Sequence, residues 1–263
     1  MVERMSRREP EGNRATPHDT VDAIAKSSRR KAFPLRRVFL QQKRGDETRP
    51  GPLARFVSAG DGTGLLLYFL ALTKASQEPW DISLHSAVWA RALDLPLPDT
   101  ATARGRVSKA WSRLADRDLV VRARQGRLAR FTLLREDGSG SPYTRPECAF
   151  VNVPHDLWTK GPVESKRWYQ LLTLPELAFL IIALSNLDDF SLPVERGPDY
   201  YGVSADTLLR GYTGLQNHDL LVVRSNAFTA PLSPTGLSYE NRYTLKPPFG
   251  PVGKVSRARS RAR

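Results

Sequence analysis

Cationic side chains that could bind phosphate are concentrated between residues 104 and 135. This segment holds 10 basic residues against 2 acidic ones. Four of the basic residues follow one another at spacings of 3, 4 and 4: Arg106, Lys109, Arg113 and Arg117. On a helix these spacings place side chains along one face. Guanidinium and ammonium groups arranged in this way can reach phosphates or guanine edges in the major groove of DNA.

A second group of cations follows directly, around a turn at Gln125-Gly126. Its members are Arg122, Arg124, Arg127 and Arg130. β-prone residues on both sides of the turn predict a hairpin over residues 120–134. Arginines on such a hairpin can contact phosphates or enter the minor groove. Together with Arg104, the cations of the helix and the hairpin are the predicted DNA-binding residues. A solvated basic face is the alternative.

The helix that would carry the first group also has an apolar face. Val107, Trp111 and Leu114 recur at i, i+4 and i+7, the spacing of a buried stripe. Similar patterns upstream predict two further helices before the hairpin. The expected ranges of these helices are about 64–75, 83–93 and 101–117.

An internal repeat extends this pattern to the second half of the chain. Leu114–Leu119 matches Leu215–Leu220 at an offset of 101 residues, and Val107 and Trp111 fall on Leu208 and Tyr212 at the same offset. Each copy then runs into a β-like segment that ends in Arg, an aromatic residue, Thr and Leu. The second copy is therefore expected to have helices at about 174–187 and 204–218, followed by a hairpin with a longer loop, Asn226–Tyr239.

Composition divides the chain into five expected parts of an α+β, mainly α, protein. The polar ends are expected to be largely disordered, and a Gly-, Ser- and Pro-rich stretch is expected to be a linker. The parts are a basic N-terminal segment, residues 1–49; the first copy, 50–135; the linker, 136–148; the second copy, 149–249; and a basic tail, 250–263.

Three helices followed by a β-hairpin, found twice in tandem, resemble the winged helix-turn-helix domains of bacterial DNA-binding regulators. Residues 107–134 resemble a recognition helix, its exit and a wing. The layout is also similar to plasmid replication initiators, which use one copy for pairing and one for the origin. The resemblance implies two tandem winged-helix domains that bind double-stranded DNA, and no residue signature separates regulator from initiator.

The net charge of +13 lies mostly at the two ends of the chain. The tail adds cations that could give non-specific affinity for DNA: Lys254, Arg257, Arg259, Arg261 and Arg263. Residues 146–249 instead hold 8 basic against 11 acidic residues. We therefore expect the second copy to serve as an accessory or homodimerisation domain, with Arg210 as a secondary candidate for DNA contact.

The residues that enzymes and metal sites need are sparse. Four scattered histidines and the single Cys148 do not have the spacing of metal ligands, and one cysteine forms no internal disulfide. Gly60–Gly64 lacks the Lys-Ser/Thr ending of a phosphate-binding loop. We expect no enzymatic activity, no metal and no cofactor.

Two apolar runs, Gly64–Leu72 and Leu177–Leu184, are about half the length that spans a bilayer. They are expected to be buried helices, without membrane association, in a cytoplasmic, nucleoid-associated protein. The leading functional hypothesis is a sequence-specific double-stranded DNA-binding protein that regulates transcription. A replication initiator is the alternative within DNA binding, and a winged-helix scaffold for protein interactions is the alternative from another class.

Overall fold

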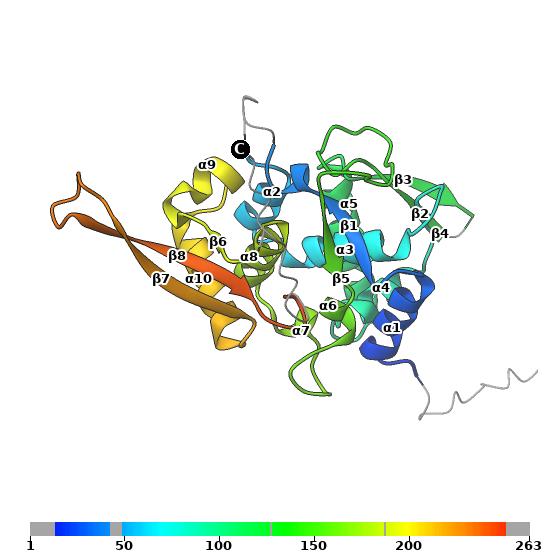
Figure 1. The fold of residues 1–263 in the computed structure, drawn as a ribbon. Coiled ribbons are helices and arrows are strands. Elements are labelled where there is room, and N and C mark those ends of the chain that lie inside the picture. Colours follow the sequence, from blue (N-terminus) through cyan, green and yellow to red (C-terminus); the bar gives the residue numbers. More distant parts are fainter. Residues whose placement is uncertain (1–13, 43–48, 127, 187, 251–263) are drawn as a thin grey trace, which may run out of the picture.

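The structure, a computed structural model, describes residues 14–42, 49–126, 128–186 and 188–250. Within these residues the chain is an α+β protein with three small antiparallel sheets (Figure 1). Two groups of elements, each ending in a β-hairpin, flank a central two-stranded sheet. The two hairpins project at opposite ends of the molecule (Figure 1).

The first group of elements, called the first unit below, follows the predicted order of helices and strands. The helix α2 (Leu53–Ser58) precedes it. The unit consists of α3 (Gly62–Lys74), β2 (Asp81–Ile82), α4 (Ser86–Ala92), α5 (Ala101–Ala115), β3 (Val120–Gln125) and β4 (Leu128–Leu133). Its strands are ordered β2-β4-β3.

The second group, called the second unit, repeats this order and adds a short 3-10 helix, η2 (Val194–Arg196). The unit consists of α8 (Leu174–Ser185), β6 (Phe190–Ser191), α9 (Gly197–Tyr201), α10 (Ala205–Asn217), β7 (Leu221–Thr229) and β8 (Leu237–Leu245). Its strands have the equivalent order β6-β8-β7.

The predicted internal repeat is confirmed, and the two copies also match in the turn that follows α5 and α10. Asp118 and Asp219 both have a left-handed backbone, with φ of 56° and 58°. The residue after each aspartate then donates its amide to a leucine carbonyl at the end of the preceding helix, at 3.1 Å for Leu119 and 2.9 Å for Leu220. The loop of the second hairpin is longer than that of the first, as predicted. It is shorter than the predicted range 226–239, because β7 continues to Thr229 and β8 begins at Leu237.

The N-terminal segment differs from its expected disorder. Residues 17–39 form α1 (Pro17–Ser27), β1 (Ala32–Arg36) and the 3-10 helix η1 (Arg37–Phe39). A capping box between Thr16 and Asp19 begins α1, and its apolar side packs against α3 and α4. The segment folds because its few apolar side chains share one face of α1 and β1, a contribution that average composition hides.

The predicted linker is also ordered and packed. Strand β5 (Phe150–Pro154) pairs with β1, and α6 (Asp156–Thr159) and α7 (Trp168–Leu171) lead into the second unit. Before β5, Glu136 is fully buried and binds Arg36, and Tyr143 is buried as well. Two anchoring side chains thus hold a stretch whose Gly, Ser and Pro content is typical of flexible chain.

The two units share one hydrophobic core. Buried side chains of the N-terminal segment, the first unit and the second unit form one continuous cluster. The Trp158 indole donates to the Thr73 hydroxyl at 3.2 Å, which joins the segment before the second unit to α3. The two apolar runs are α3 and α8, both buried as expected. No helix in the described ranges is long and apolar enough to cross a membrane.

Glycine lets α10 approach α8 closely. A Cβ added at Gly211 would lie 2.5 Å from the Pro175 carbonyl oxygen and 2.8 Å from the Phe179 Cβ. Gly211→Ala is therefore expected to lower the free energy of unfolding by about 1–3 kcal/mol through overpacking, measured by urea unfolding. Gly105 in α5 is the matched control, because an added Cβ there meets nothing within 4 Å. Gly105→Ala should stabilise by up to about 1 kcal/mol, and equal effects of the two changes would contradict the close packing.

Candidate nucleic-acid interface

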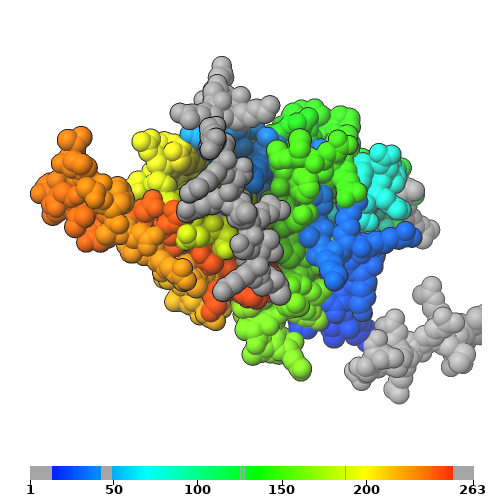
Figure 2. Space-filling model, in the orientation of Figure 1, coloured from blue at the N-terminus to red at the C-terminus, as the bar shows by residue number. Residues whose placement is uncertain are grey.

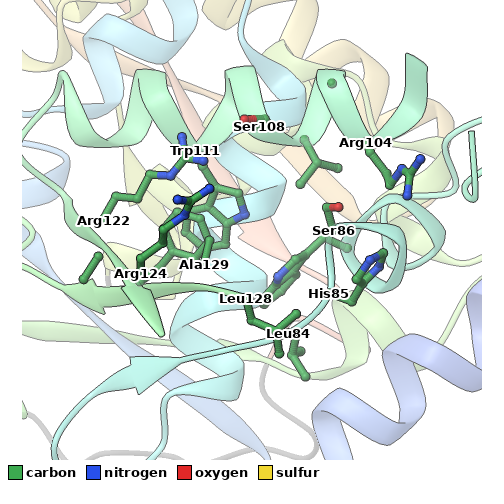
Figure 3. A pocket seen from close by; sticks show the side chains of 15 residues that line it. Leu84, His85, Ser86, Arg104, Ser108, Trp111, Arg122, Arg124, Leu128 and Ala129 are labelled. Atoms are coloured by element: carbon green, nitrogen blue, oxygen red, sulfur yellow. The ribbon is translucent and has the colours of Figure 1, made fainter. Parts of the chain in front are cut away.

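A groove of about 810 Å³ lies between α5 and the hairpin β3–β4 (Figure 3). Its floor is aromatic, because the Trp111 ring stacks on Phe131 with centroids 3.8 Å apart and planes 10° from parallel. Its rim is cationic. Arg122 and Arg124 lie beside Trp111, and Arg104 lies at the other end near the start of α4 (Figure 3).

Helix α5 positions Arg104 through its cap and its buried face. The Thr100 hydroxyl accepts the Ala103 amide at 3.3 Å and so begins the helix. The buried side contains Ala103, Val107, Ala110, Trp111 and Leu114. Arg104 and Ser108 lie next to this buried side on the edge that faces the hairpin, because both line the groove.

The hairpin directs two arginines toward α5. Arg122 and Arg124 are two residues apart on β3, so their side chains leave the same face of the strand. Arg122 is paired with Phe131 and Arg124 with Ala129. Since Phe131 contacts Trp111 of α5, this face of the hairpin is the one that faces the helix.

Five of the predicted DNA-binding side chains are exposed and have no carboxylate partner among the described residues: Arg104, Arg106, Lys109, Arg122 and Arg124. Burying a cation without a partner costs several kcal/mol, so unpaired arginines remain in water or bind anions. Lys109 lies on the solvent side of α5, together with exposed Ser112. The unpaired cations thus lie both beside the groove and on the open face of α5.

The structure does not place Arg113 and Arg117 on the open face with Arg106 and Lys109: Arg113 is held in an ion pair, and Arg117, which follows the end of α5, is buried. Arg113 makes a bidentate pair with Asp61, at 2.9 Å from Nε and 2.7 Å from a terminal nitrogen. Arg117 binds the same carboxylate at 2.6 Å and lies 4.2 Å from the centroid of the Phe56 ring. The buried stripe of α5 also includes Ala103 and Ala110, so Arg113 lies at its edge rather than opposite it, and Arg117 follows the end of the helix.

Asp61 is a structural residue that sequence reasoning missed. Its carboxylate also accepts the Gly64 amide at 2.9 Å and so caps α3. Burial would raise its pKa, but the hydrogen bonds from Arg113, Arg117 and the Gly64 amide outweigh burial and lower the pKa from 3.8 to about 2. An aspartate just before an apolar run indicates a cap, whereas nothing local indicates its two arginine partners.

The other predicted contacts are paired or lie elsewhere. Arg130 binds Asp81 of β2 at the base of the hairpin, which makes it a less available contact than predicted. In α10, Arg210 pairs with Asp206 one turn earlier, at 3.1 Å. The remaining predicted contacts lie outside the described residues: Arg127, Arg257, Arg259, Arg261 and Arg263.

The second unit has no equivalent of the cationic groove within its described residues. Tyr212 takes the place of Trp111 and lies 5.5 Å from Tyr243, the counterpart of Phe131. The aromatic floor is therefore repeated. The cationic rim is not, because Val223 and Ser225 of β7 occupy the positions that Arg122 and Arg124 occupy in β3. Only Arg224 adds a cation to β7.

Comparison with models of protein families, with curated proteins and with solved structures finds no match to this chain. Within the described residues, no three side chains of His, Cys, Asp or Glu come together as metal ligands would. The features that bear on function are therefore the groove, its unpaired cations and the repeated order of elements.

Proposed function

We propose that this chain binds double-stranded DNA through the first unit, and that both units are winged helices. The observation that carries the proposal is the cluster of unpaired arginines on both sides of the groove between α5 and its hairpin: Arg104, Arg122 and Arg124. The order of helices and strands in each unit, with α5 and α10 directly before the hairpins, supports the winged-helix assignment.

In this proposal α5 lies in the major groove and the hairpin contacts the flanking backbone. Lys109 and Ser112 are on the open face of α5, where they can reach base edges. Arg122 and Arg124 extend from the hairpin and supply charge-assisted hydrogen bonds to phosphates. Asp61 contributes indirectly, since its two ion pairs hold Arg113 of α5, and Arg117 just after α5, at the start of α3.

Regulation of transcription is the role we propose for this binding. The alternative roles make different demands on the same surface. A replication initiator would bind repeated sites beside an origin, whereas a protein scaffold would not need the unpaired arginines. The sequence enriched from a pool of random duplexes, and its position in the genome, separates these roles.

The triple variant Arg104→Ala/Arg122→Ala/Arg124→Ala tests the proposal. We expect it to weaken duplex binding at least tenfold near 0.1 M salt. The slope of log K against log salt should become shallower by about 0.9 for each phosphate that the variant no longer neutralises. Fluorescence anisotropy across a salt series measures both quantities. Because the three side chains are exposed and unpaired, the stability of the fold should be unchanged.

A variant with the same change of charge is the control: Arg55→Ala/Arg145→Ala/Arg196→Ala. These arginines are also exposed, and none of them lines the groove. The control should keep most of the wild-type affinity. If both triple variants lose the same amount of binding, net charge rather than the groove holds DNA, and the assignment of the first unit fails.

A further inference from the structure

The outer edge of β7 is nine residues long, and among the described residues no other strand pairs with it. In the order β6-β8-β7, β7 is bonded to β8 alone. Residues 224–229 are exposed throughout. Figures 1 and 2 show the hairpin β7–β8 extending away from the body of the molecule, at the end opposite the first hairpin.

The register identifies which backbone groups of β7 point outward. The Ala230 amide donates to Gly236 at 2.8 Å, and at the other end the Lys246 amide donates to Leu220 at 2.8 Å. In an antiparallel pair, bonding toward the partner strand alternates from residue to residue. Even-numbered residues of β7 therefore bond to β8, and the odd-numbered residues direct their N–H and C=O groups outward: Leu221, Val223, Ser225, Ala227 and Thr229.

This edge lacks the features that prevent strands from pairing. Exposed edges are usually protected by charged side chains, proline or bulges. The outward-bonding residues of β7 are all uncharged, those in its exposed part are small (Ser225, Ala227 and Thr229), and the single charged residue of the strand is Arg224. The corresponding edge strand of the first unit, β3, carries Arg122 and Arg124 instead.

Apolar side chains gather on the same hairpin. Of the eight large apolar side chains that are exposed in the described residues, four belong to it: Phe228, Leu232, Leu237 and Tyr239. Tyr239 is opposite Ala227 and Leu237 is opposite Thr229, so both lie on the sheet face of the outward-bonding residues. Such a surface suits another protein strand and offers little to phosphates.

We propose that β7 pairs antiparallel with β7 of a second copy of this chain, which joins the two hairpins in one sheet. The same strand serves both copies, so the contact has two-fold symmetry and closes as a dimer. The outward-bonding side chains are small enough to meet across the seam, with Tyr239 of each copy on the neighbouring strand. The dimer does not depend on DNA binding, and the groove of each first unit stays open at the far end of its subunit.

Sedimentation equilibrium of the full chain without DNA tests this proposal. The wild type should sediment with twice the mass of one chain, and Ala227→Pro should raise the dimer dissociation constant by about ten- to a hundredfold, because each dimer loses two outward N–H donors. Proline is tolerated where the N–H faces away from the sheet. Ala227→Thr is the control, since it keeps the N–H donor and suits a strand, and it should dimerise like the wild type.

Ser225→Lys gives a second route that does not restrict the backbone. It places a charge on the edge of both copies and should weaken the dimer as well. Circular dichroism establishes that each variant is folded. Three results would overturn the proposal: a monomeric wild type at all concentrations, larger open-ended assemblies, or dimers of both variants as tight as the control.

Discussion

Replacing Asp61 by alanine is expected to lower the free energy of unfolding by about 3–5 kcal/mol, because the change leaves the buried Arg117 guanidinium without its partner carboxylate. The Arg113 side chain is 42% exposed, so the loss of its ion pair contributes less. Arg117 is 8% exposed, and Arg113 and Arg117 both bind this one carboxylate. The change also removes the cap of α3, a contribution of about 1 kcal/mol. Urea unfolding followed by circular dichroism measures the loss.

Asp61→Asn separates the charge from the cap. The asparagine oxygen can still accept the Gly64 amide, so this variant should lose the ion pairs and keep most of the cap. Its cost should lie between those of wild type and Asp61→Ala. Equal stability of Asp61→Asn and wild type would show that the two arginines gain nothing from the negative charge.

The pKa of Asp61 determines how its contribution to the stability of the fold depends on pH. The pKa of Asp61 is lowered from 3.8 to about 2 in the folded chain, so the folded state binds this proton less readily than the unfolded state. The stabilisation is fully present above about pH 4 and is lost as the pH falls toward 2. Asp61→Asn has no such group, so its stability should fall less over this window.

Arg36→Ala is the second change with a large expected effect, again about 3–5 kcal/mol near neutral pH. Glu136 is fully buried, and its carboxylate binds both the guanidinium and the backbone amide of Arg36, the latter at 3.2 Å. The Arg36 guanidinium also donates to the Thr144 carbonyl and hydroxyl, at 2.8 Å each. Removing it leaves an unpaired carboxylate in the core where β1 and residues 136–144 meet.

The stability of Arg36→Ala should depend on pH with the opposite sign to the stabilisation that Asp61 contributes in the wild type. Burial raises the pKa of Glu136 although Arg36 acts to lower it, and without Arg36 the pKa should rise further. Ionisation of Glu136 then costs stability as the pH rises through the window above its usual value of 4.5. Arg36→Ala should therefore lower the free energy of unfolding least in mild acid, where Glu136 is protonated.

The double variant Arg36→Ala/Glu136→Gln is the matched control. It replaces the buried carboxylate by a neutral amide, so the penalty for an unpaired charge disappears. It should recover part of the lost stability at neutral pH and unfold with less dependence on pH than Arg36→Ala. If the double variant is no more stable than Arg36→Ala, the cost comes from lost packing of the arginine rather than from Glu136.

Local patterns in the sequence determined the elements that form the site. Periodic apolar residues placed the third helix at about 101–117, against 101–115 in the structure, where Thr100 is its cap. The match of Leu114–Leu119 with Leu215–Leu220 predicted two equivalent copies, and in the structure Asp118 and Asp219 both have left-handed backbones. These features depend on neighbours within a few residues, so spacing and residue type are enough to find them.

Tertiary structure alone decided which arginines are available. Arg106, Lys109, Arg113 and Arg117 look alike by spacing, yet two of them bind Asp61, which lies 52 and 56 residues away in the chain. The buried pair between Arg36 and Glu136, 100 residues apart, is equally invisible in local pattern. A guanidinium can be buried only where folding brings a carboxylate to it, so its exposure depends on the packing of distant segments.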